Sequence, residues 1–257
     1  MIYITGDTHS YFDRFTMQNF PEQKEMTKKD IVIILGDFGG VWCRKENQKA
    51  MKTESHILDE LDKRSFTTIF IPGNHENYER LMSNEFPEKE WHGGRVKEIR
   101  PSIFMLMRGE MFELEGKKFF AFGGAASHDI QDGILDYEDP LWRKKARRMD
   151  ANGKYMYRVK GLSWWAEELP STEEKTHAIH VLDKNNWQCD YVLTHESPAS
   201  DVILLGQGFY KPDDFSKWLE EIRCKLNYKH WFCGHYHENK NINMTDHLLY
   251  EQIILIL

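Results

Sequence analysis

The sequence predicts an α/β fold in which buried strands alternate with helices. Short, nearly continuous apolar runs, such as 31–35 and 68–71, suit strands that are buried on both faces. Longer amphipathic stretches at 45–63 and 213–226 are typical of helices. Strands that alternate with helices favour βαβ units and mostly parallel pairing.

Each of the clearest apolar runs ends in a polar loop. The expected strands lie at 2–4, 31–35, 68–71, 191–193 and 231–233, and the loops follow at 6–9, 36–37, 72–75, 194–195 and 234–237. Sheets of this kind carry their polar sites at the carboxyl ends of the strands. We therefore expect these loops, which are far apart in sequence, to meet at one edge of the sheet.

The rest of the chain is less regular. Antiparallel strands are expected at 103–107, 111–114 and 118–122, with Glu115-Gly116 as a turn, and a further apolar strand at 248–257. They could form a second sheet that packs against helices or against the first sheet. A segment at about 125–162, rich in charged, aromatic and glycine residues, is interpreted as an insertion in a single domain that spans 1–257.

Composition and charge exclude several classes of protein. With 40% hydrophobic and 13% aromatic residues, the chain can bury a substantial core, which excludes a disordered protein. A net charge of -7 argues against wholesale coating of nucleic acid but leaves a local basic patch open. The 4 cysteines form no CxxC pair, which favours reduced thiols in a cytoplasmic protein over a disulfide framework or a zinc ribbon. Neither a signal peptide nor an apolar stretch near the roughly 18 residues of a membrane span is found, so no membrane contact is expected.

The loops at the strand ends carry side chains that suit metal ions. The candidate ligands are Asp7, His9, Asp37, Asn74, His195, His235 and His237, and His75 lies beside them. A Gly-Asp pair alone is often only a turn, and a lone histidine is usually a hydrogen-bonded surface residue. The joint occurrence of these residues, in order and each just after an expected strand, is what indicates a metal centre.

The residue types indicate which metals and which substrate suit this centre. Imidazole, carboxylate and amide oxygen atoms without thiolate favour Mn, Fe, Zn, Co or Ni over Ca or Mg, and Mn is the favoured ion. The ligands are too many for one ion but suit two ions that share a carboxylate. Two dications about 4 Å apart repel by roughly 17 kcal/mol at an effective dielectric constant of 20, so Asp37 and a hydroxide are expected to bridge them. The centre then keeps a positive charge, which favours a phosphate ester that gains negative charge in its transition state.

The motifs resemble those of the calcineurin-like metallophosphoesterase superfamily, whose pattern is GDxH, GD, GNH, H and GHxH. The matches span positions 6 to 237, nearly the whole chain. The resemblance implies two mixed β-sheets packed as a sandwich and flanked by helices, with a dinuclear site at the strand carboxyl ends. It implies that Asp7, His9 and His237 hold one metal, that Asn74, His195 and His235 hold the other, and that Asp37 bridges. His75 would contact the phosphate and protonate the leaving oxygen.

Two positions depart from the family's pattern. Ser10 stands where many members have glycine, at a position without a ligand role. Phe38 follows Asp37, so the chain lacks the Asp-Arg-Gly extension of the Ser/Thr protein phosphatases, whose arginine grips phosphate. This departure disfavours protein phosphatase activity. The stretches 122–129 and 163–165 resemble bacterial and phage-encoded phosphoesterases whose substrates are mostly unassigned.

The insertion is strongly basic from 141 to 160. Its charged residues are Arg143, Lys144, Lys145, Arg147, Arg148, Lys154, Arg158 and Lys160 against Asp150, with Trp142, Tyr155 and Tyr157 among them. The run is typical of a solvated charged helix, and it also fits a lid in which Arg147 and Arg148 contact a nucleotide or nucleic acid. His128 fits either a loop hydrogen bond or a substrate contact. Glu76 fits either support of a ligand loop or the charge at a helix N-terminus, and Trp164-Trp165 indicates core packing more than base stacking.

The expected function is hydrolysis of phosphate esters by a metal-bridging hydroxide, with Asp37 and His75 as catalytic residues. Asn74 is expected to contact the substrate together with His75. A phosphodiester or nucleotide-type substrate is favoured because of the basic, aromatic insertion. The alternatives are a phosphomonoesterase, including a protein phosphatase, and a non-catalytic metal-binding scaffold. A scaffold of this kind should lack ligands, whereas every expected ligand and His75 are present here.

Overall fold

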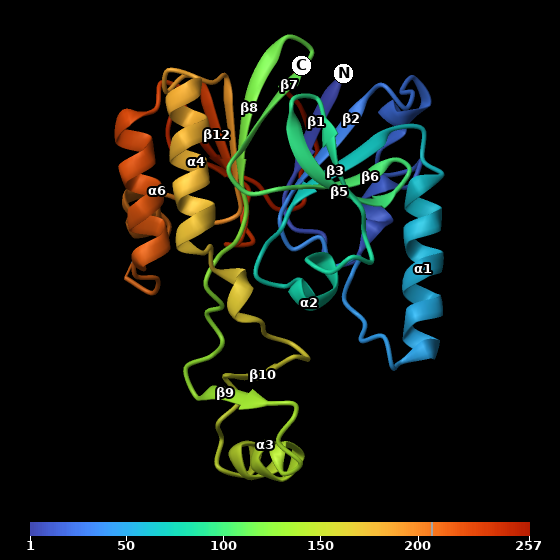
Figure 1. Cartoon of the computed structure of the whole chain (residues 1–257), viewed down its shortest axis with the longest axis vertical. Helices are drawn as coiled ribbons and strands as arrows, with labels where there is room; N and C mark the ends of the chain where they lie inside the picture. The colour runs from blue at the N-terminus through green and yellow to red at the C-terminus, as the bar shows by residue number, and fades with distance from the viewer. Residues whose placement is uncertain (207) are drawn as a thin grey trace.

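Two large β-sheets stacked face to face form the body of the computed structural model, which describes residues 1–206 and 208–257 (Figure 1). The first sheet contains β1 (Ile2–Thr5), β2 (Ile31–Leu35), β3 (Thr67–Ile71), β4 (Glu88–Trp91), β5 (Gly94–Arg100), β6 (Ile103–Leu106) and β15 (Ile254–Leu255). Its order is β15-β1-β2-β3-β6-β5-β4, and the four strands β1, β2, β3 and β6 run parallel. The antiparallel strands lie at its two edges.

The second sheet is built in the same way. It contains β7 (Glu110–Leu114), β8 (Lys117–Phe122), β11 (Tyr191–Thr194), β12 (His230–Cys233), β13 (Lys240–Asn241) and β14 (Asp246–Leu248), in the order β13-β14-β12-β11-β8-β7. The four central strands are parallel, and β7 pairs antiparallel with β8. The expected turn is confirmed, because Glu115 and Gly116 between β7 and β8 have φ values of 49° and 69°, as a two-residue hairpin turn requires.

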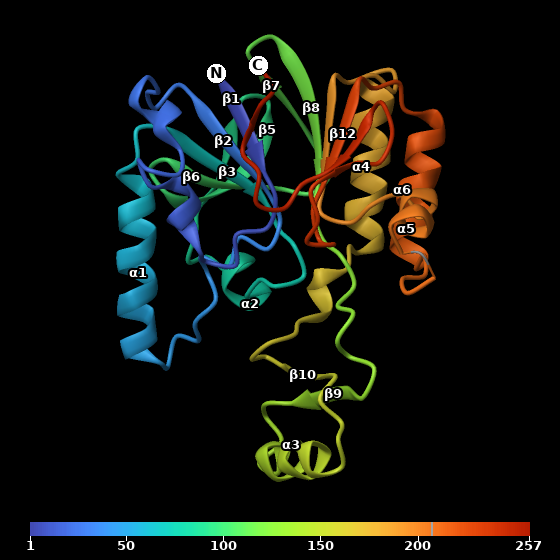
Figure 2. The same cartoon turned by 180° about the vertical axis from the view of Figure 1, so that it is seen from behind.

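Three apolar layers hold the sandwich together. Ile4, Ile33, Phe119 and Phe232 belong to the buried cluster between the two sheets. A second cluster packs α1 (Gln48–Asp62) on the outer face of the first sheet. A third packs α4 (Thr172–Lys184) and α6 (Asp214–Lys225) on the outer face of the second sheet (Figures 1 and 2). Both faces of each sheet are covered, so the central strands are buried along nearly their whole length. The predicted fold class is confirmed.

The three helices that pack on the sheets begin at polar residues that accept hydrogen bonds from their first turn. Asn47 caps α1, Ser171 and Glu174 form a capping box on α4, and Asp213 caps α6. The helices predicted at 45–63 and 213–226 are therefore confirmed, each a little shorter than expected. The shorter helices are α2 (Tyr78–Leu81) and α5 (Ala199–Gly206). Among the described residues, no helix has the length and apolar character needed to cross a membrane.

The prediction of one apolar strand at 248–257 was wrong. This tail contributes the end of β14 to the second sheet and β15 to the first, with an irregular crossing between them. The hydrogen bond from Gly6 N–H to Tyr250 O, 3.1 Å long, holds the crossing against the loop after β1. The backbone N–H and C=O groups of the tail pair first with the second sheet and then with the first, so each of its two strands is short.

The segment 125–162, here called the arm, projects from one end of the body (Figures 1 and 2). It contains β9 (Gly133–Asp136), α3 (Trp142–Ala151) and β10 (Tyr157–Lys160). The two strands pair in parallel and, among the described strands, pair with no others; α3 connects them. In both views α3 forms the far end of the arm, away from the two sheets.

Candidate metal centre

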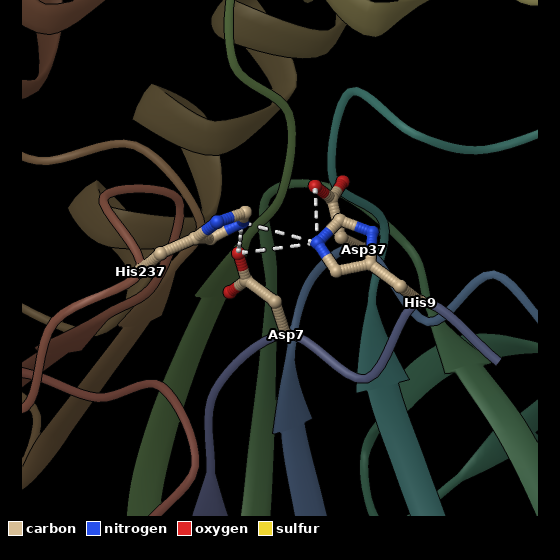
Figure 3. A group of neighbouring side chains, drawn as sticks. All are labelled: Asp7, His9, Asp37 and His237. Carbon is tan, nitrogen blue, oxygen red and sulfur yellow. Dashed lines mark hydrogen bonds and ion pairs between the residues drawn. The ribbon is translucent and has the colours of Figure 1, made fainter. Parts of the chain in front are cut away.

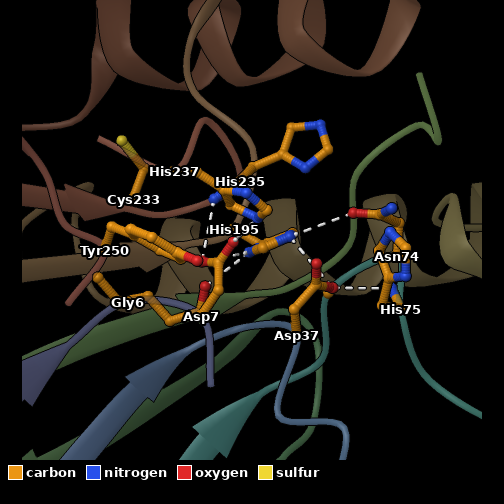
Figure 4. Close-up of polar contacts among 12 residues, drawn as sticks. Gly6, Asp7, Asp37, Asn74, His75, His195, Cys233, His235, His237 and Tyr250 are labelled. Atoms are coloured by element: carbon orange, nitrogen blue, oxygen red, sulfur yellow. Dashed lines mark hydrogen bonds and ion pairs between the residues drawn. The ribbon is translucent and has the colours of Figure 1, made fainter. Parts of the chain in front are cut away.

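The loops after five strands bring the candidate ligands together. Asp7 and His9 follow β1, Asp37 follows β2, Asn74 and His75 follow β3, His195 follows β11, and His235 and His237 follow β12 (Figures 3 and 4). The first three strands belong to one sheet and the last two to the other. The site therefore lies across one end of the sandwich, at the carboxyl ends of parallel strands from both sheets.

Asp7, His9, Asp37 and His237 form one compact group, whose candidate ligand atoms all lie within 4.8 Å of one another. His237 Nε2 lies 3.2 Å from Asp7 Oδ2 and 3.1 Å from His9 Nε2 (Figure 3). His9 Nε2 is 3.8 Å from Asp37 Oδ2. Two carboxylates and two imidazoles thus point toward a common centre.

Asp37 also faces a second group. Its Oδ1 lies 3.3 Å from His195 Nε2, which in turn is 3.2 Å from Asn74 Oδ1. The backbone N–H of His75 donates a 2.7 Å hydrogen bond to the same Oδ1 (Figure 4). One carboxylate oxygen therefore faces the first group and the other faces the second.

His235 stands between this second group and a further pair of side chains. Its ring centroid is 5.0 Å from that of His195. Its Nε2 lies 3.4 Å from His128 Nε2 and 3.9 Å from Glu196 Oε2. His128, Glu196 and His235 form a second set of side chains that could hold a metal ion. His128 is thus brought to the site, and Glu196 joins it without having been expected there.

The backbone is strained where it presents these ligands. His9, Asp37, His235 and His237 have φ values of 46°, 42°, 73° and 50°. Residues other than glycine rarely adopt such values, and each costs on the order of 1–3 kcal/mol. The strain is concentrated at the strand ends that carry the candidate ligands, which is typical of a functional site.

Glycines in the motifs leave room for the ligands. A Cβ atom on Gly73 would lie 2.1 Å from Asp37 Oδ1, and one on Gly234 would lie 2.3 Å from Asp7 Oδ1. A Cβ on Gly36 would lie 2.2 Å from His195 Nδ1. Any larger residue would displace a ligand side chain, so these glycines are required by close packing around the site.

Hydrogen bonds behind the site fix its orientation. His195 Nδ1 lies 2.6 Å from Leu35 O, which turns Nε2 toward Asp37. Glu76 accepts hydrogen bonds from the backbone N–H groups of Phe38 at 2.7 Å and Gly39 at 3.3 Å, so it supports the loop of Asp37. These contacts favour the first of the two interpretations of Glu76, in which it supports a loop that carries a candidate ligand. Burial, together with the charge of Asp37, raises the pKa of Glu76 to about 8.

The electrostatics of the site suit bound cations. Burial alone would raise the pKa of Asp37, but His195, His75 and His9 outweigh it and hold that pKa far below its usual range. Burial would lower the pKa of His195, yet Asp37 and Asp7 raise it to about 10. Among the described residues, no hydrogen bond reaches the buried Oδ2 of Asp7, although it lies beside His237. A buried carboxylate oxygen without a donor, surrounded by imidazoles, fits a metal ion.

Two predicted substrate contacts lie elsewhere. Arg147 and Arg148 are exposed on α3, at the far end of the arm, and neither joins the candidate ligands. The helix α3 therefore does not form a lid over the site. Trp165 is buried and packs edge-on against Trp42 with 5.7 Å between ring centroids, so the prediction of core packing is confirmed for this residue.

Sequence reasoning missed several neighbours of the site. Tyr250 stacks on His237 with 4.6 Å between ring centroids and an angle of 15°. Ser127 accepts a 3.3 Å hydrogen bond from Asn74 Nδ2. Arg158 Nη2 lies 3.2 Å from His75 Nε2. These three residues follow no motif, and only the path of the tail and of the arm brings them to the site.

The comparisons with known proteins agree with this geometry. A family model described as calcineurin-like phosphoesterase matches residues 1–239. Lariat debranching enzyme A of Xenopus laevis is 24% identical over 259 residues, which cover 92% of this chain and 42% of that protein. This chain thus spans less than half the length of that relative. A solved crystal structure aligned over 96% of this chain and 88% of its own has 12% identity and a TM-score of 0.44, a likeness too remote to carry an argument. From the match over residues 1–239, the chain belongs to the calcineurin-like phosphoesterase family.

Proposed function

We propose that this chain hydrolyses phosphodiesters or nucleotide-type phosphate esters at a centre of two divalent metal ions. The family supports metal-dependent hydrolysis of phosphate esters. The observation that carries the finer proposal is the position of Asp37. Its Oδ2 faces His9 at 3.8 Å and its Oδ1 faces His195 at 3.3 Å, so a single carboxylate is available to both halves of the site.

The two halves would each hold one ion. Asp7, His9 and His237 would be the ligands on one side, Asn74, His195 and His235 those on the other, and Asp37 would be shared. This donor set of nitrogen and oxygen atoms suits Mn, Fe, Zn, Co or Ni, with Mn favoured. When bound, such ions would acidify water and neutralise charge on the phosphate.

His75 is placed to act on the leaving oxygen. Its backbone is tied to Asp37, and its side chain lines both a cavity of about 220 Å³ at the candidate ligands and a groove of about 550 Å³ beside them. A phosphate seated at the ligands would have its leaving group near this boundary. His75 would then hold a proton for the departing oxygen, while Asn74 and His128 would contact the phosphate.

The groove of about 550 Å³ favours an aromatic organic group on the ester. It runs from His9 and His75 to α1 and is lined by Trp42, Ala50 and Ile57. The Trp42 ring is tilted by only 24° from that of His75, with 6.2 Å between their centroids. A flat apolar wall of this size suits a nucleobase. The similarity to a protein named a lariat debranching enzyme also supports a diester.

A phosphomonoesterase is the second candidate. Protein phosphatase activity is the less favoured form of it, because Phe38 is buried and stacks on Phe70 with 4.1 Å between ring centroids. The position after Asp37 therefore faces the core and presents no cation. A non-catalytic scaffold is disfavoured because the candidate ligands and His75 converge at one place.

The decisive experiment compares bis-p-nitrophenyl phosphate with p-nitrophenyl phosphate, each with Mn²⁺ and with a chelator. Mn-dependent turnover of the diester is the expected result. Turnover of the monoester alone would move the assignment to a phosphatase. If neither ester reacts while metal analysis finds the ions bound, hydrolysis of simple esters is refuted and the scaffold becomes the better account.

A further inference from the structure

The arm reaches the candidate metal centre through one residue of β10, Arg158. Its Nη2 lies 3.2 Å from His75 Nε2 and 3.5 Å from His75 Nδ1. Among the residues that the structure describes, no other Lys or Arg side chain comes within hydrogen-bond distance of the His75 side chain or of the side chain of any candidate ligand. The arm thus places a permanent positive charge beside the proposed proton donor.

Arg158 is held in this position by the base of the arm. Asp129 Oδ2 accepts a 2.7 Å hydrogen bond from Arg158 Nε and pairs with its Nη2. Asp129 itself lines the cavity of about 220 Å³ together with Asp37 and His75. The neighbouring Val159 is buried, and its N–H donates to Ser163 Oγ at 3.0 Å. Arg158 therefore has a defined orientation, unlike the exposed basic side chains of α3.

One nitrogen of the guanidinium group, Nη1, is available to a ligand. The side chain of Arg158 is 19% exposed, and among the described residues no protein acceptor contacts its Nη1. Its Nη1 can donate to phosphoryl oxygens while Nε and Nη2 stay paired with Asp129, whereas lysine has a single nitrogen and cannot serve both partners with this fixed geometry. The other arginine at the site, Arg14, donates to the backbone oxygens of Asp7 and Tyr250 and so serves the fold.

We propose that Arg158 binds the phosphoryl oxygens of the substrate beside His75, which makes the base of the arm part of the active site. This inference rests on the proposed function. The loop after Asp37 cannot offer a cation, because Phe38 is packed in the core. A charge fixed next to the reacting phosphate stabilises it most in the transition state, when its negative charge is greatest.

The test compares Arg158→Gln and Arg158→Lys with Arg143→Gln, a matched change of an exposed arginine on α3. With bis-p-nitrophenyl phosphate, Arg158→Gln should lower kcat/KM by about 10²–10³, and Arg158→Lys should recover only part of it. Arg143→Gln should match the wild type. Metal content by mass spectrometry and melting temperature should be unchanged in Arg158→Gln.

Two readouts separate phosphate binding from a structural role. Calorimetric titration of inorganic phosphate into the metal-loaded proteins should show at least about 10-fold weaker binding for Arg158→Gln. Added guanidinium ion should partly restore turnover to Arg158→Gly but not to His75→Ala. Two results would overturn the inference. In the first, Arg158→Gln keeps the phosphate affinity and turnover of the wild type. In the second, Arg158→Gln loses activity only together with metal or folding, and guanidinium ion does not rescue Arg158→Gly.

The outcome also distinguishes this inference from the proposed function. A wild type that binds phosphate through Arg158 but hydrolyses neither test ester would refute the function and keep the phosphate site. A wild type that hydrolyses the diester while Arg158→Gln is equally active would keep the function and refute the role of Arg158.

Discussion

The carboxylate of Asp37 and the imidazole of His195 come from different sheets and meet with 3.3 Å between Oδ1 and Nε2. This contact joins the two halves of the sandwich at the site itself. The other oxygen of Asp37 turns toward His9. One side chain, which is only 1% exposed, therefore contacts both groups of candidate ligands.

Asp37→Ala should lose both bound metal and activity. Without the shared carboxylate, two dications would face each other with less negative charge between them, and their repulsion at about 4 Å is roughly 17 kcal/mol at an effective dielectric constant of 20. Metal analysis after desalting is expected to show clearly reduced occupancy. The control is Asp214→Ala, at a side chain that is 99% exposed. Retention of two metals and full turnover by Asp37→Ala would refute the shared-ligand assignment.

His75→Ala should lower kcat while the protein keeps its metals. Loss of one general acid typically reduces the rate by about 10²–10⁴, and less when the leaving group is good. The deficit should therefore be larger for an alkyl or nucleoside ester than for a nitrophenyl ester. His180→Ala, at an exposed position of α4, serves as the control. An equal deficit for both kinds of ester would argue against proton donation by His75.

Gly73→Ala should disturb the metal site more than it disturbs the fold. Its Cβ would lie 2.1 Å from Asp37 Oδ1 and 2.4 Å from the backbone nitrogen of Asp37, so the carboxylate and the loop that carries it have to move. Gly116→Ala provides the comparison, because its Cβ meets nothing within 4 Å although its φ of 69° is strained for alanine. We expect reduced metal occupancy in Gly73→Ala and a loss of roughly 1 kcal/mol in stability without metal loss in Gly116→Ala. Equal metal content in the two variants would contradict the steric argument.

Local pattern was enough to predict the central strands and the candidate ligands, because Asp7, Asp37 and Asn74 each lie within three residues of the end of an apolar run. The convergence of these loops then follows from parallel pairing. Arg158 and Tyr250 could not be found in this way. Their contacts with His75 and His237 depend on how the arm and the tail return to the body, which no short-range periodicity encodes. The tail was mispredicted for the same reason, since its strands exist only where an edge of each sheet is free to pair.

Charge reversal at Arg147 and Arg148 should affect large substrates alone. Both residues are exposed on α3, at the far end of the arm, so a short ester at the metal centre cannot reach them. Arg147→Glu/Arg148→Glu should raise KM for a single-stranded oligonucleotide and reduce its salt dependence, because fewer phosphates are neutralised. KM for bis-p-nitrophenyl phosphate should stay unchanged. The control is Lys63→Glu/Lys217→Glu, two exposed sites on the body. An unchanged KM for the oligonucleotide would leave α3 as a solvated charged helix.

Asp201 places a carboxylate in the contact between α5 and α6. Its Oδ2 lies 2.9 Å from Arg223 Nη1, and the same guanidinium group pairs with Asp246 and Glu220. Burial raises the pKa of Asp201 from 3.8 to about 6, even though Arg223 opposes that change. The folded chain therefore binds this proton more tightly than the unfolded chain does.

The contribution of Asp201 to stability should fall as the pH rises between these two values. A carboxyl whose pKa is raised by folding stabilises the protein below about pH 4, where it is protonated in both states, and this advantage is lost as the pH passes about 6. The asparagine of Asp201→Asn cannot ionise. The free energy of unfolding of this variant, relative to that of the wild type, should therefore rise by about 1–3 kcal/mol between pH 4 and pH 7. Urea unfolding at several pH values measures this, with Asp214→Asn as the exposed control. The opposite result is a difference in free energy of unfolding between Asp201→Asn and the wild type that stays constant or shrinks as the pH rises. That result would show that the ion pair with Arg223 outweighs burial, because it would favour the charged carboxylate.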